Sequence, residues 1–332
     1  MKQKVRAAAV QASPVFLDLN ASVEKACSII REAAENGADL VALPEAFLPG
    51  YPYWIWLGDP GAQLQTWFRR FWKNAVTIPG PAVSRISDAA REHGVYVNIS
   101  VTERDGGSLY LSQLWFDREG NLMGKHRKLR PTLAERVVWG DGDGSTMPVF
   151  DTEIGRLGGL QCWEHMMPAN AAVMASMNEQ IHVASYPAFS WDENSIFAAM
   201  PCQIATRYYA MATGTFVIQT SETLSAETVD AICGSDAYKR TIYREGFGAG
   251  ARIISPGGQI LGEYADPHSE GIAYADLDLD EIIDAKSRLD IAGHYSRGSA
   301  VSVLFNRDPQ QAVRPTGTPA DCRLSYSALH ER

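Results

Sequence analysis

The chain has 332 residues, of which 45% are hydrophobic and 21% charged, and its 30 basic and 39 acidic side chains give a net charge of −9. This composition excludes a mainly disordered chain, and the acidic balance without a Lys/Arg-rich tract argues against a general nucleic-acid binder, which needs a basic face. No apolar run approaches the roughly 20 residues that span a bilayer, and no signal-peptide pattern opens the chain, so we expect a soluble cytoplasmic protein without membrane contact.

The first half of the chain predicts alternating strands and helices. Short apolar runs bounded by glycine or proline favour strands, whereas apolar residues three or four positions apart favour helices. In chain order, the predicted strands are Val5–Val10, Asp39–Leu43, Val95–Val101, Ser108–Asp117, Leu122–Lys128, Thr146–Thr152 and Arg156–Gln161. The predicted helices between them are Ser22–Asn36 and Ser84–His93.

The second half returns to the same alternation after its hairpins. The predicted strands are Ile181–Ser185, Thr215–Thr220, Ala251–Ser255, Gln259–Tyr264 and Gly271–Leu277, and the predicted helices are Ala169–Met177, Cys202–Ala212 and Asp280–Ser287. This order predicts one mixed α/β domain of two similar halves, with helices covering the sheets. We place this domain at residues 4–306 and treat residues 307–332 as a tail that is interfacial or flexible. Two segments have no predicted element, the aromatic-rich Tyr51–Asn74 and the polar Ser221–Gly246, and insertions of this length are usually functional or interfacial.

One of the five cysteines stands apart from the others. The odd number and the lack of a CxxC pair argue against a disulfide framework and against a zinc knuckle. Cys162 follows a glycine-bearing strand, and Pro168 then opens a helix. This junction lies near helix N-terminal dipoles, which favour the thiolate, and at the carboxyl end of a strand, where α/β folds build their sites. The alternative for any free cysteine is a small buried hydrophobe.

Two further strand ends carry groups that a thiol nucleophile needs. Glu45 follows an apolar strand and a proline, and burial there would raise its pKa and make it a better base. Lys128 closes a strand in which alternation separates it from Lys125 and Arg127 and directs it toward the sheet end. The alternatives are a surface turn for the glutamate and a solvated basic edge for the lysine.

Three segments of the sequence resemble the signature segments of the nitrilase superfamily, in the same order and at similar separations. They are Leu43-Pro44-Glu45-Ala46, Gly124-Lys125-His126-Arg127-Lys128-Leu129 and Gly159-Leu160-Gln161-Cys162-Trp163-Glu164. The Cys-Trp-Glu-His form is similar to the true nitrilase branch, close to microbial arylacetonitrilases, and the N-terminal half is also similar to cyanide dihydratases.

This resemblance implies a fold, a set of roles and an assembly. The implied fold is an αββα sandwich, which becomes αββα–αββα when two subunits pair and can extend into spiral homo-oligomers. Cys162 is implied as the nucleophile, Glu45 as the general base and Lys128 as the cation that faces the developing negative charge. Glu135 matches the glutamate that positions the lysine and the substrate. The implied reaction uses neither a metal nor an organic cofactor.

The implied substrate is a nitrile, and the sequence leaves its side chain open. Aromatic residues near the site predict an apolar substrate, an arylaliphatic or aliphatic mononitrile, although core or interface packing would also explain them. We expect substrate contacts from Tyr51, Trp54, Trp163, His165 and Trp191. Hydrogen cyanide remains an alternative substrate, and an amidase or carbamoyl hydrolase would use the same three groups. A non-catalytic assembly protein is the alternative of a different class.

Overall fold

The centre of the molecule is a 12-stranded sheet that folds over on itself. The computed structural model describes residues 4–190, 198–243, 248–264, 266, 269–310, 313, 316 and 317. The strands are β1 Lys4–Gln11, β2 Leu40–Ala42, β3 Tyr96–Asp105, β4 Ser108–Phe116, β5 Leu122–Arg127, β6 Phe150–Thr152, β7 Gly155–Gln161, β8 Ile181–Tyr186, β9 Phe216–Ser221, β10 Ala251–Ile254, β11 Ile260–Tyr264 and β12 Gly271–Asp278. Their order is β5-β4-β3-β2-β1-β9-β8-β7-β6, with β12 beside β1, and β10 pairing with β9 and β11.

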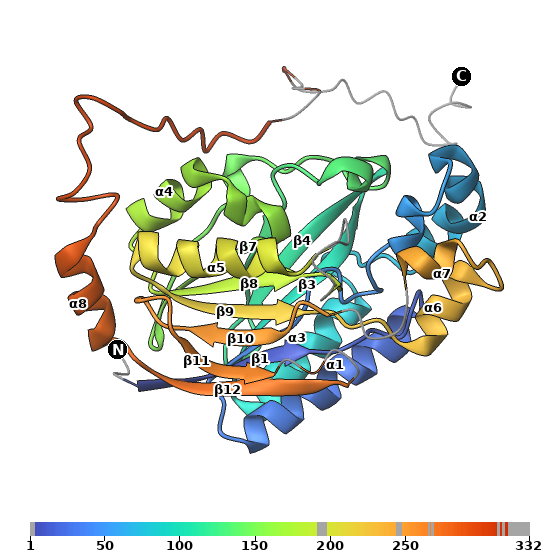
Figure 1. Ribbon diagram of the computed structural model, residues 1–332, viewed down its shortest axis with the longest axis horizontal. Helices are drawn as coiled ribbons and strands as arrows, with labels where there is room; N and C mark the ends of the chain where they lie inside the picture. Colours follow the sequence, from blue (N-terminus) through green and yellow to red (C-terminus); the bar gives the residue numbers. More distant parts are fainter. Residues whose placement is uncertain are drawn as a thin grey trace, which may run out of the picture.

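Helices cover both outer faces of this sheet. The α-helices are α1 Leu19–Glu35, α2 Pro60–Lys73, α3 Pro81–His93, α4 Pro168–Ser176, α5 Met200–Thr213, α6 Ala226–Cys233, α7 Lys239–Ile242 and α8 Asp280–Arg288. The 3₁₀ helices are η1 Tyr53–Trp56, η2 Leu133–Val137, η3 Gly144–Thr146 and η4 Cys162–Met166. Helices α1 and α3 lie on one face, and α4 and α5 lie on the other (Figure 1).

Polar side chains join the two halves of the sheet across the middle of the sandwich. Ser100 of β3 donates to the side chain of Gln161 at the end of β7, and Gln113 of β4 donates to Ser185 of β8 at 2.9 Å. The β2–β5 half therefore packs face to face against the β7–β9 half. With helices outside each half, this is the predicted αββα sandwich, and the fold prediction is confirmed.

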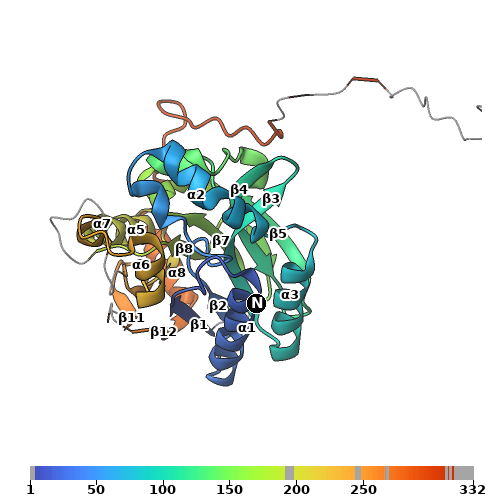
Figure 2. The same ribbon diagram turned by 90° about the vertical axis from the view of Figure 1, so that its right-hand side faces the viewer.

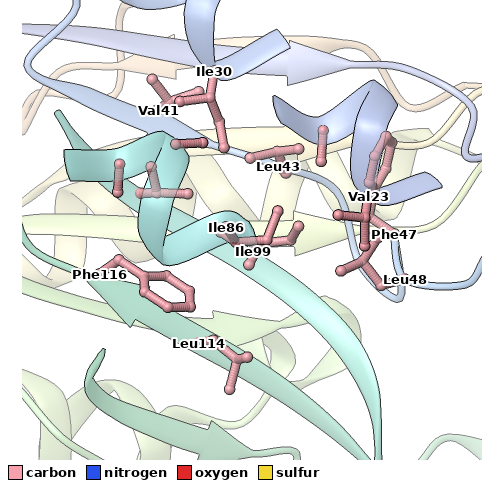
Figure 3. Close-up of a cluster of buried hydrophobic side chains, with 14 of the residues drawn as sticks. Val23, Ile30, Val41, Leu43, Phe47, Leu48, Ile86, Ile99, Leu114 and Phe116 are labelled. Atoms are coloured by element: carbon pink, nitrogen blue, oxygen red, sulfur yellow. The ribbon is translucent and has the colours of Figure 1, made fainter. Parts of the chain in front are cut away.

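The core under α1 and α3 shows why these two segments are helical. The N-cap Asp18 accepts a hydrogen bond from the Ala21 N–H at the start of α1, and α3 begins at Pro81, a favoured first position. Their apolar faces pack on the sheet: Figure 3 shows Val23, Ile30 and Ile86 of these helices beside Val41, Leu43, Phe47, Leu48, Ile99, Leu114 and Phe116. Complete burial of such a side chain contributes about 1.5–3 kcal/mol, so this apolar stripe holds both helices on the sheet.

The predicted strands and helices are present with ends that differ by a few residues, but the two insertions contain helices that the sequence analysis did not predict. Tyr51–Asn74 contains η1 and α2, and Ser221–Gly246 contains α6 and α7, which lie together at one end of the molecule (Figure 2). Phe71 is the one residue of α2 that is completely buried, but Leu64, Trp67, Phe68 and Trp72 share its face at helical spacing and pack half-buried on the same core, so a periodic signal was present. The N-cap Asp59 and the following Pro60 were the available start signals.

Strand direction brings several strand ends to one edge of the sandwich. The parallel pairs are β1–β2, β2–β3, β1–β9, β8–β9 and β7–β8. β4 is antiparallel to both β3 and β5, so β5 runs in the direction of β3. The residues that follow β2, β5, β7 and β8 consequently meet at the same edge, although they are far apart in the sequence.

After α8, the described chain up to Gln310 contains neither helix nor strand and runs along the outside above α4 in Figure 1. Phe305 packs on the core beneath α4 and α5, and the Gln310 N–H donates to Asp143 at 2.7 Å. The domain boundary at residue 306 remains a prediction. In the described ranges, no helix is both long and apolar enough to cross a membrane.

Candidate active site

Glu45 lies in a tight turn after β2. Its N–H donates to the carbonyl of Tyr186 at 3.3 Å, and the next residue, Ala46, has a φ of 55° and donates to Ser100 Oγ at 2.9 Å. A positive φ is uncommon for a residue with a side chain, and here the turn directs the Glu45 carboxyl inward. The side chain is completely buried.

Lys128 follows β5 and joins two carboxylates from different parts of the chain. Its Nζ lies 2.9 Å from Glu45 Oε1 and 2.8 Å from Glu135 Oε2, and all three side chains are buried. The predicted alternation is confirmed, since Lys125 and Arg127 point away from this cluster and pair with Glu103 instead. Burial opposes the charge of Lys128, but the two carboxylates outweigh it and hold the lysine pKa well above its usual value.

Glu135 is fixed by three donors. Its Oε2 accepts from the Thr132 N–H at 2.6 Å as well as from Lys128, in a capping box that opens η2. Its Oε1 accepts from the Tyr51 hydroxyl at 2.8 Å. The carboxylate is therefore oriented before any substrate binds.

Cys162 is the first residue of η4 and forms an elbow directly after β7. Its φ of 48° lies in the left-handed region, a conformation that persists only when the surroundings impose it. Glu164 supplies part of that constraint, because its carboxylate accepts from the Gln161 N–H and the Leu129 N–H, both at 2.9 Å, and from His126 Nε2 at 2.9 Å. Glu164 thus ties the cysteine elbow to the residue that follows Lys128.

The Cys162 thiol is not the thiolate that its position at a helix start led us to expect. Burial raises the pKa of the Cys162 thiol well above its usual value, and the Glu45 charge raises it further while Lys128 opposes both. The thiol is therefore protonated at neutral pH and needs a base. Burial also raises the pKa of Glu45, from 4.5 to about 8 against the lowering effect of Lys128, which brings it close to the pH at which a general base works best. Glu45 Oε2 has no hydrogen-bond partner among the described residues, so it is available to accept a proton.

A largely aromatic cavity of about 140 Å³ opens beside Cys162 and Glu135. Its other lining residues are Tyr51, Tyr53, Trp56, Thr132, Leu133, Trp163, Pro187, Ala188, Phe189 and Tyr243. The lining includes two of the five expected substrate contacts, Tyr51 and Trp163. It does not include Trp54, which packs in the core against Phe71 with ring centroids 5.9 Å apart.

His165 also lies outside the cavity lining, because its ring is directed behind the elbow onto the Cys162 carbonyl. The fifth expected contact, Trp191, lies outside the described residues. The four groups predicted from strand ends and motifs, Glu45, Lys128, Glu135 and Cys162, do come together. Within the described ranges, no group of three or more His, Cys, Asp or Glu side chains is arranged to hold a metal ion.

The structure adds residues that sequence reasoning did not assign. Glu164 was visible only as part of a motif, although its spacing of three from Gln161 is a capping-box signal. Glu222 follows β9, is completely buried and accepts from the Tyr53 hydroxyl at 2.6 Å. Burial raises its pKa from 4.5 to about 8, against the lowering effect of Tyr53. No local pattern marks such a carboxyl, because only long-range packing buries it.

Comparison with known proteins gives a consistent family. A family model described as carbon-nitrogen hydrolase matches residues 6–287. A nitrilase from Bacillus sp. (strain OxB-1) is 48% identical over 326 residues, covering 98% of this chain and 95% of that protein. An aliphatic nitrilase from Rhodococcus rhodochrous is 44% identical, covering 94% of this chain and 85% of that protein.

More distant comparisons agree. An arylacetone-specific nitrilase from Alcaligenes faecalis is 36% identical, covering 93% of this chain and 87% of that protein. A solved carbon-nitrogen hydrolase from Helicobacter pylori G27 is similar in fold, with a TM-score of 0.67 at 21% identity, covering 86% of this chain and 93% of that one.

Proposed function

The chain belongs to the carbon-nitrogen hydrolase family and to the nitrilases within it, and on this basis we propose that it hydrolyses a nitrile to the carboxylic acid and ammonia through a covalent intermediate on Cys162. One observation carries the assignment of residues. A buried Lys128 holds two carboxylates, Glu45 and Glu135, and Glu135 lines the same cavity as Cys162. A buried charged cluster of this kind is costly unless it serves chemistry or a unique packing.

In the first half of the reaction, Glu45 takes the proton of the Cys162 thiol while the sulfur adds to the nitrile carbon. The C–S bond forms, one π bond of the nitrile breaks, and Glu45 passes the thiol proton to the nitrogen to give a thioimidate. Glu45 is then ionised again for the next step. Lys128 opposes the negative charge that develops on nitrogen, and the burial of the lysine strengthens this interaction. Because the thiol is protonated at rest, this step depends on the base and not on a preformed thiolate.

In the second half, a water molecule loses a proton to Glu45 and adds to the thioimidate carbon. The tetrahedral intermediate expels ammonia, which takes its proton from Glu45, and leaves a thioester. A second water then cleaves the C–S bond, releases the carboxylic acid and restores the thiol. If the tetrahedral intermediate loses sulfur before nitrogen, the product is the amide instead. Glu135 orients Lys128, and the Tyr51 hydroxyl in turn orients Glu135.

The cavity supports an arylaliphatic or aliphatic mononitrile. A cavity of about 140 Å³ is close to the engineered cavity of about 150 Å³ that holds benzene, so one ring or an alkyl chain of similar volume fits. The walls Tyr53, Trp56, Phe189 and Tyr243 are aromatic and suit an apolar side chain. Hydrogen cyanide would leave most of this volume unfilled.

A panel of nitriles with their matching amides tests the function. Ammonia release, and acid and amide products, are measured for an arylacetonitrile, an aliphatic nitrile, cyanide and the amide of each nitrile. We expect turnover of the larger nitriles and no turnover by Cys162→Ala. When the reaction of the wild type is quenched with acid, mass spectrometry should show an added mass on Cys162. Faster release from the amides would make the protein an amidase, and turnover by Cys162→Ala would disprove the nucleophile.

We also propose that two subunits pair through the α4–α5 face to give αββα–αββα, and that these dimers extend into spiral homo-oligomers through the insertions and the tail at residues 307–332. Ile204, Tyr208 and Met211 are exposed on one side of α5 at helical spacing, and such an apolar stripe favours an interface. Ile204→Glu should reduce the mass measured by light scattering, whereas Ile283→Glu, at a residue of α8 that is also exposed, should not.

A cytoplasmic location fits the cysteines. Cys27, Cys162, Cys202 and Cys233 are all free thiols, as expected in a reducing compartment. Fractionation of the source cells would test this location, and recovery of the protein outside the cytoplasm would contradict it.

A further inference from the structure

A chain of four buried titratable side chains runs from the back of Cys162 into the helix layer. His165 Nδ1 lies 2.7 Å from the Cys162 carbonyl oxygen, and its Nε2 lies 2.9 Å from Nε2 of His182. His182 Nδ1 lies 2.8 Å from Glu179 Oε1, and the Tyr209 hydroxyl donates to Glu179 Oε2 at 2.6 Å. All four side chains are buried, and none of them lines the cavity. The mechanism above uses none of them.

The hydrogen-bond partners determine where the protons sit along this chain. Burial, together with the neighbouring His182, lowers the pKa of His165 to about 3, so this ring is neutral and carries one proton. A carbonyl oxygen only accepts, so that proton lies on Nδ1, and the bare Nε2 accepts from His182 Nε2–H. One proton remains between His182 Nδ1 and Glu179. Whether His182 Nδ1 or Glu179 Oε1 carries this proton, the two atoms form a hydrogen bond, and the Tyr209 hydroxyl still donates to Glu179 Oε2.

The surroundings leave this chain no room to move. The His182 and Tyr209 rings lie with centroids 4.0 Å apart, and Tyr186 stacks on His165 at 5.5 Å. Gly158 of β7 makes the space for the carboxylate, since a Cβ there would lie 2.1 Å from Glu179 Oε1. The carboxylate of Glu179 thus explains one glycine of the strand that leads to Cys162.

The end of this chain lies on the strained residue itself. Cys162 has a φ of 48°, and such a conformation is kept only when neighbouring groups over-determine it. Glu164 holds the backbone just before the cysteine through the Gln161 N–H, whereas His165 holds the carbonyl just after it. These two anchors lie on either side of the atom that must point into the cavity.

We propose that His165, His182, Glu179 and Tyr209 are positioning residues for catalysis, which hold the Cys162 elbow so that the sulfur meets the substrate at the reactive distance. The proposal rests on the proposed function, because it needs a reaction at Cys162. A displacement of about 1 Å at a nucleophile can reduce the rate about 100-fold without changing binding. The chain thus acts on kcat and leaves KM almost unchanged.

The experiment compares substitutions in the full-length enzyme with a nitrile that the wild type hydrolyses. His165→Phe keeps a ring but removes both bonds, and we expect kcat to fall about 10- to 100-fold with KM within about 2-fold. His165→Asn places an amide N–H where Nδ1–H was, and should recover most of that loss. Tyr209→Phe removes only the far hydroxyl and should lower kcat about 3- to 10-fold. The control is Thr206→Val on the same helix, which removes a buried hydrogen bond of 2.7 Å to Gln219.

Each variant is also unfolded thermally and titrated with iodoacetamide. We expect Tyr209→Phe and Thr206→Val to melt at similarly lowered temperatures, while only Tyr209→Phe loses kcat and alkylates Cys162 at a changed rate. Equal kcat losses in these two variants would reduce the chain to a packing role and overturn the proposal. Wild-type kcat in both His165→Phe and Tyr209→Phe would also overturn it. If His165→Phe does not fold, the kcat values of Tyr209→Phe and His165→Asn still test the proposal. A wild type that releases no ammonia from any nitrile would instead refute the proposed function.

Discussion

Replacement of Lys128 by methionine tests the electrostatic argument for the site most directly. Lys128→Met keeps the length and apolar body of the side chain but leaves Glu45 and Glu135 buried without their cation. Loss of one partner of a buried ion pair costs about 3–5 kcal/mol, since the other charge stays in a low dielectric. By comparison, the half-exposed Lys25–Glu270 pair at 2.7 Å is worth about 0–1 kcal/mol, so Lys25→Met is the matched control.

The predicted loss of stability depends on pH in a defined direction. A carboxyl whose pKa is raised in the folded state, as for Glu45 from 4.5 to about 8, stabilises the fold in its neutral form. That contribution is complete below the unfolded value and disappears as the pH rises through the folded value. Lys128 lowers the pKa of Glu45, so its removal moves the folded value still higher. Over each pH unit in which folded Lys128→Met holds a proton that the unfolded chain has lost, the free energy of unfolding falls by about 1.36 kcal/mol.

Urea unfolding at pH 5.5 and at pH 9 measures this effect. We expect Lys128→Met to lose more stability relative to the wild type at pH 9 than at pH 5.5, and Lys25→Met to lose little at either pH. The addition of Glu45→Gln and Glu135→Gln to Lys128→Met removes the orphaned charges and should recover most of the loss at pH 9. An equal loss at both pH values would refute the reasoning, because it would mean that the lysine contributes packing and not charge.

Three further predictions concern single positions. Glu45→Gln cannot accept the thiol proton and should lower kcat about 10²- to 10⁴-fold. In the wild type, kcat/KM should rise with pH through about 8 as Glu45 ionises, and a kcat/KM that stays constant from pH 6 to 9 would contradict this role. Tyr51→Phe removes the 2.8 Å bond to Glu135 and should cost about 1–3 kcal/mol in urea unfolding and raise KM, whereas unchanged kinetics would show that Lys128 and the Thr132 N–H are sufficient to orient Glu135. Gly158→Ala should destabilise by about 1–3 kcal/mol because its Cβ would meet Glu179, while Gly107→Ala, with no atom within 4 Å, should be neutral, and differential scanning calorimetry compares the two.

The sequence predicted most of the framework because its signals are local. Periodicity, Pro168 at a helix start and glycine turns placed the strands and helices within a few residues. It did not predict α2 or α6. These helices bury only part of their surface, against an end of the molecule that the rest of the chain builds. Along α2, the helical spacing of Leu64, Trp67, Phe68, Phe71 and Trp72 was present in the sequence, but the aromatic-rich segment was interpreted only as an insertion.

The site divides in a similar way. Glu45, Lys128 and Cys162 were predictable because each follows a strand and lies in a recognisable motif. Their contacts were not, since Glu45 and Lys128 are 83 positions apart and Tyr51 and Glu135 are 84 apart. Sequence position also suggested a substrate contact for His165, yet the fold turns this ring behind the nucleophile.

By itself, the sequence determined which chemical groups stand at the ends of which strands, and hence that a thiol, a carboxyl and an amine are available for one reaction. Only the tertiary structure decided their charge. The helix-start argument favoured a thiolate at Cys162, but burial raises the pKa of that thiol and raises that of Glu45 to about 8. The reason is physical: desolvation depends on every segment that packs around a group, and in this protein those segments come from both halves of the folded sheet.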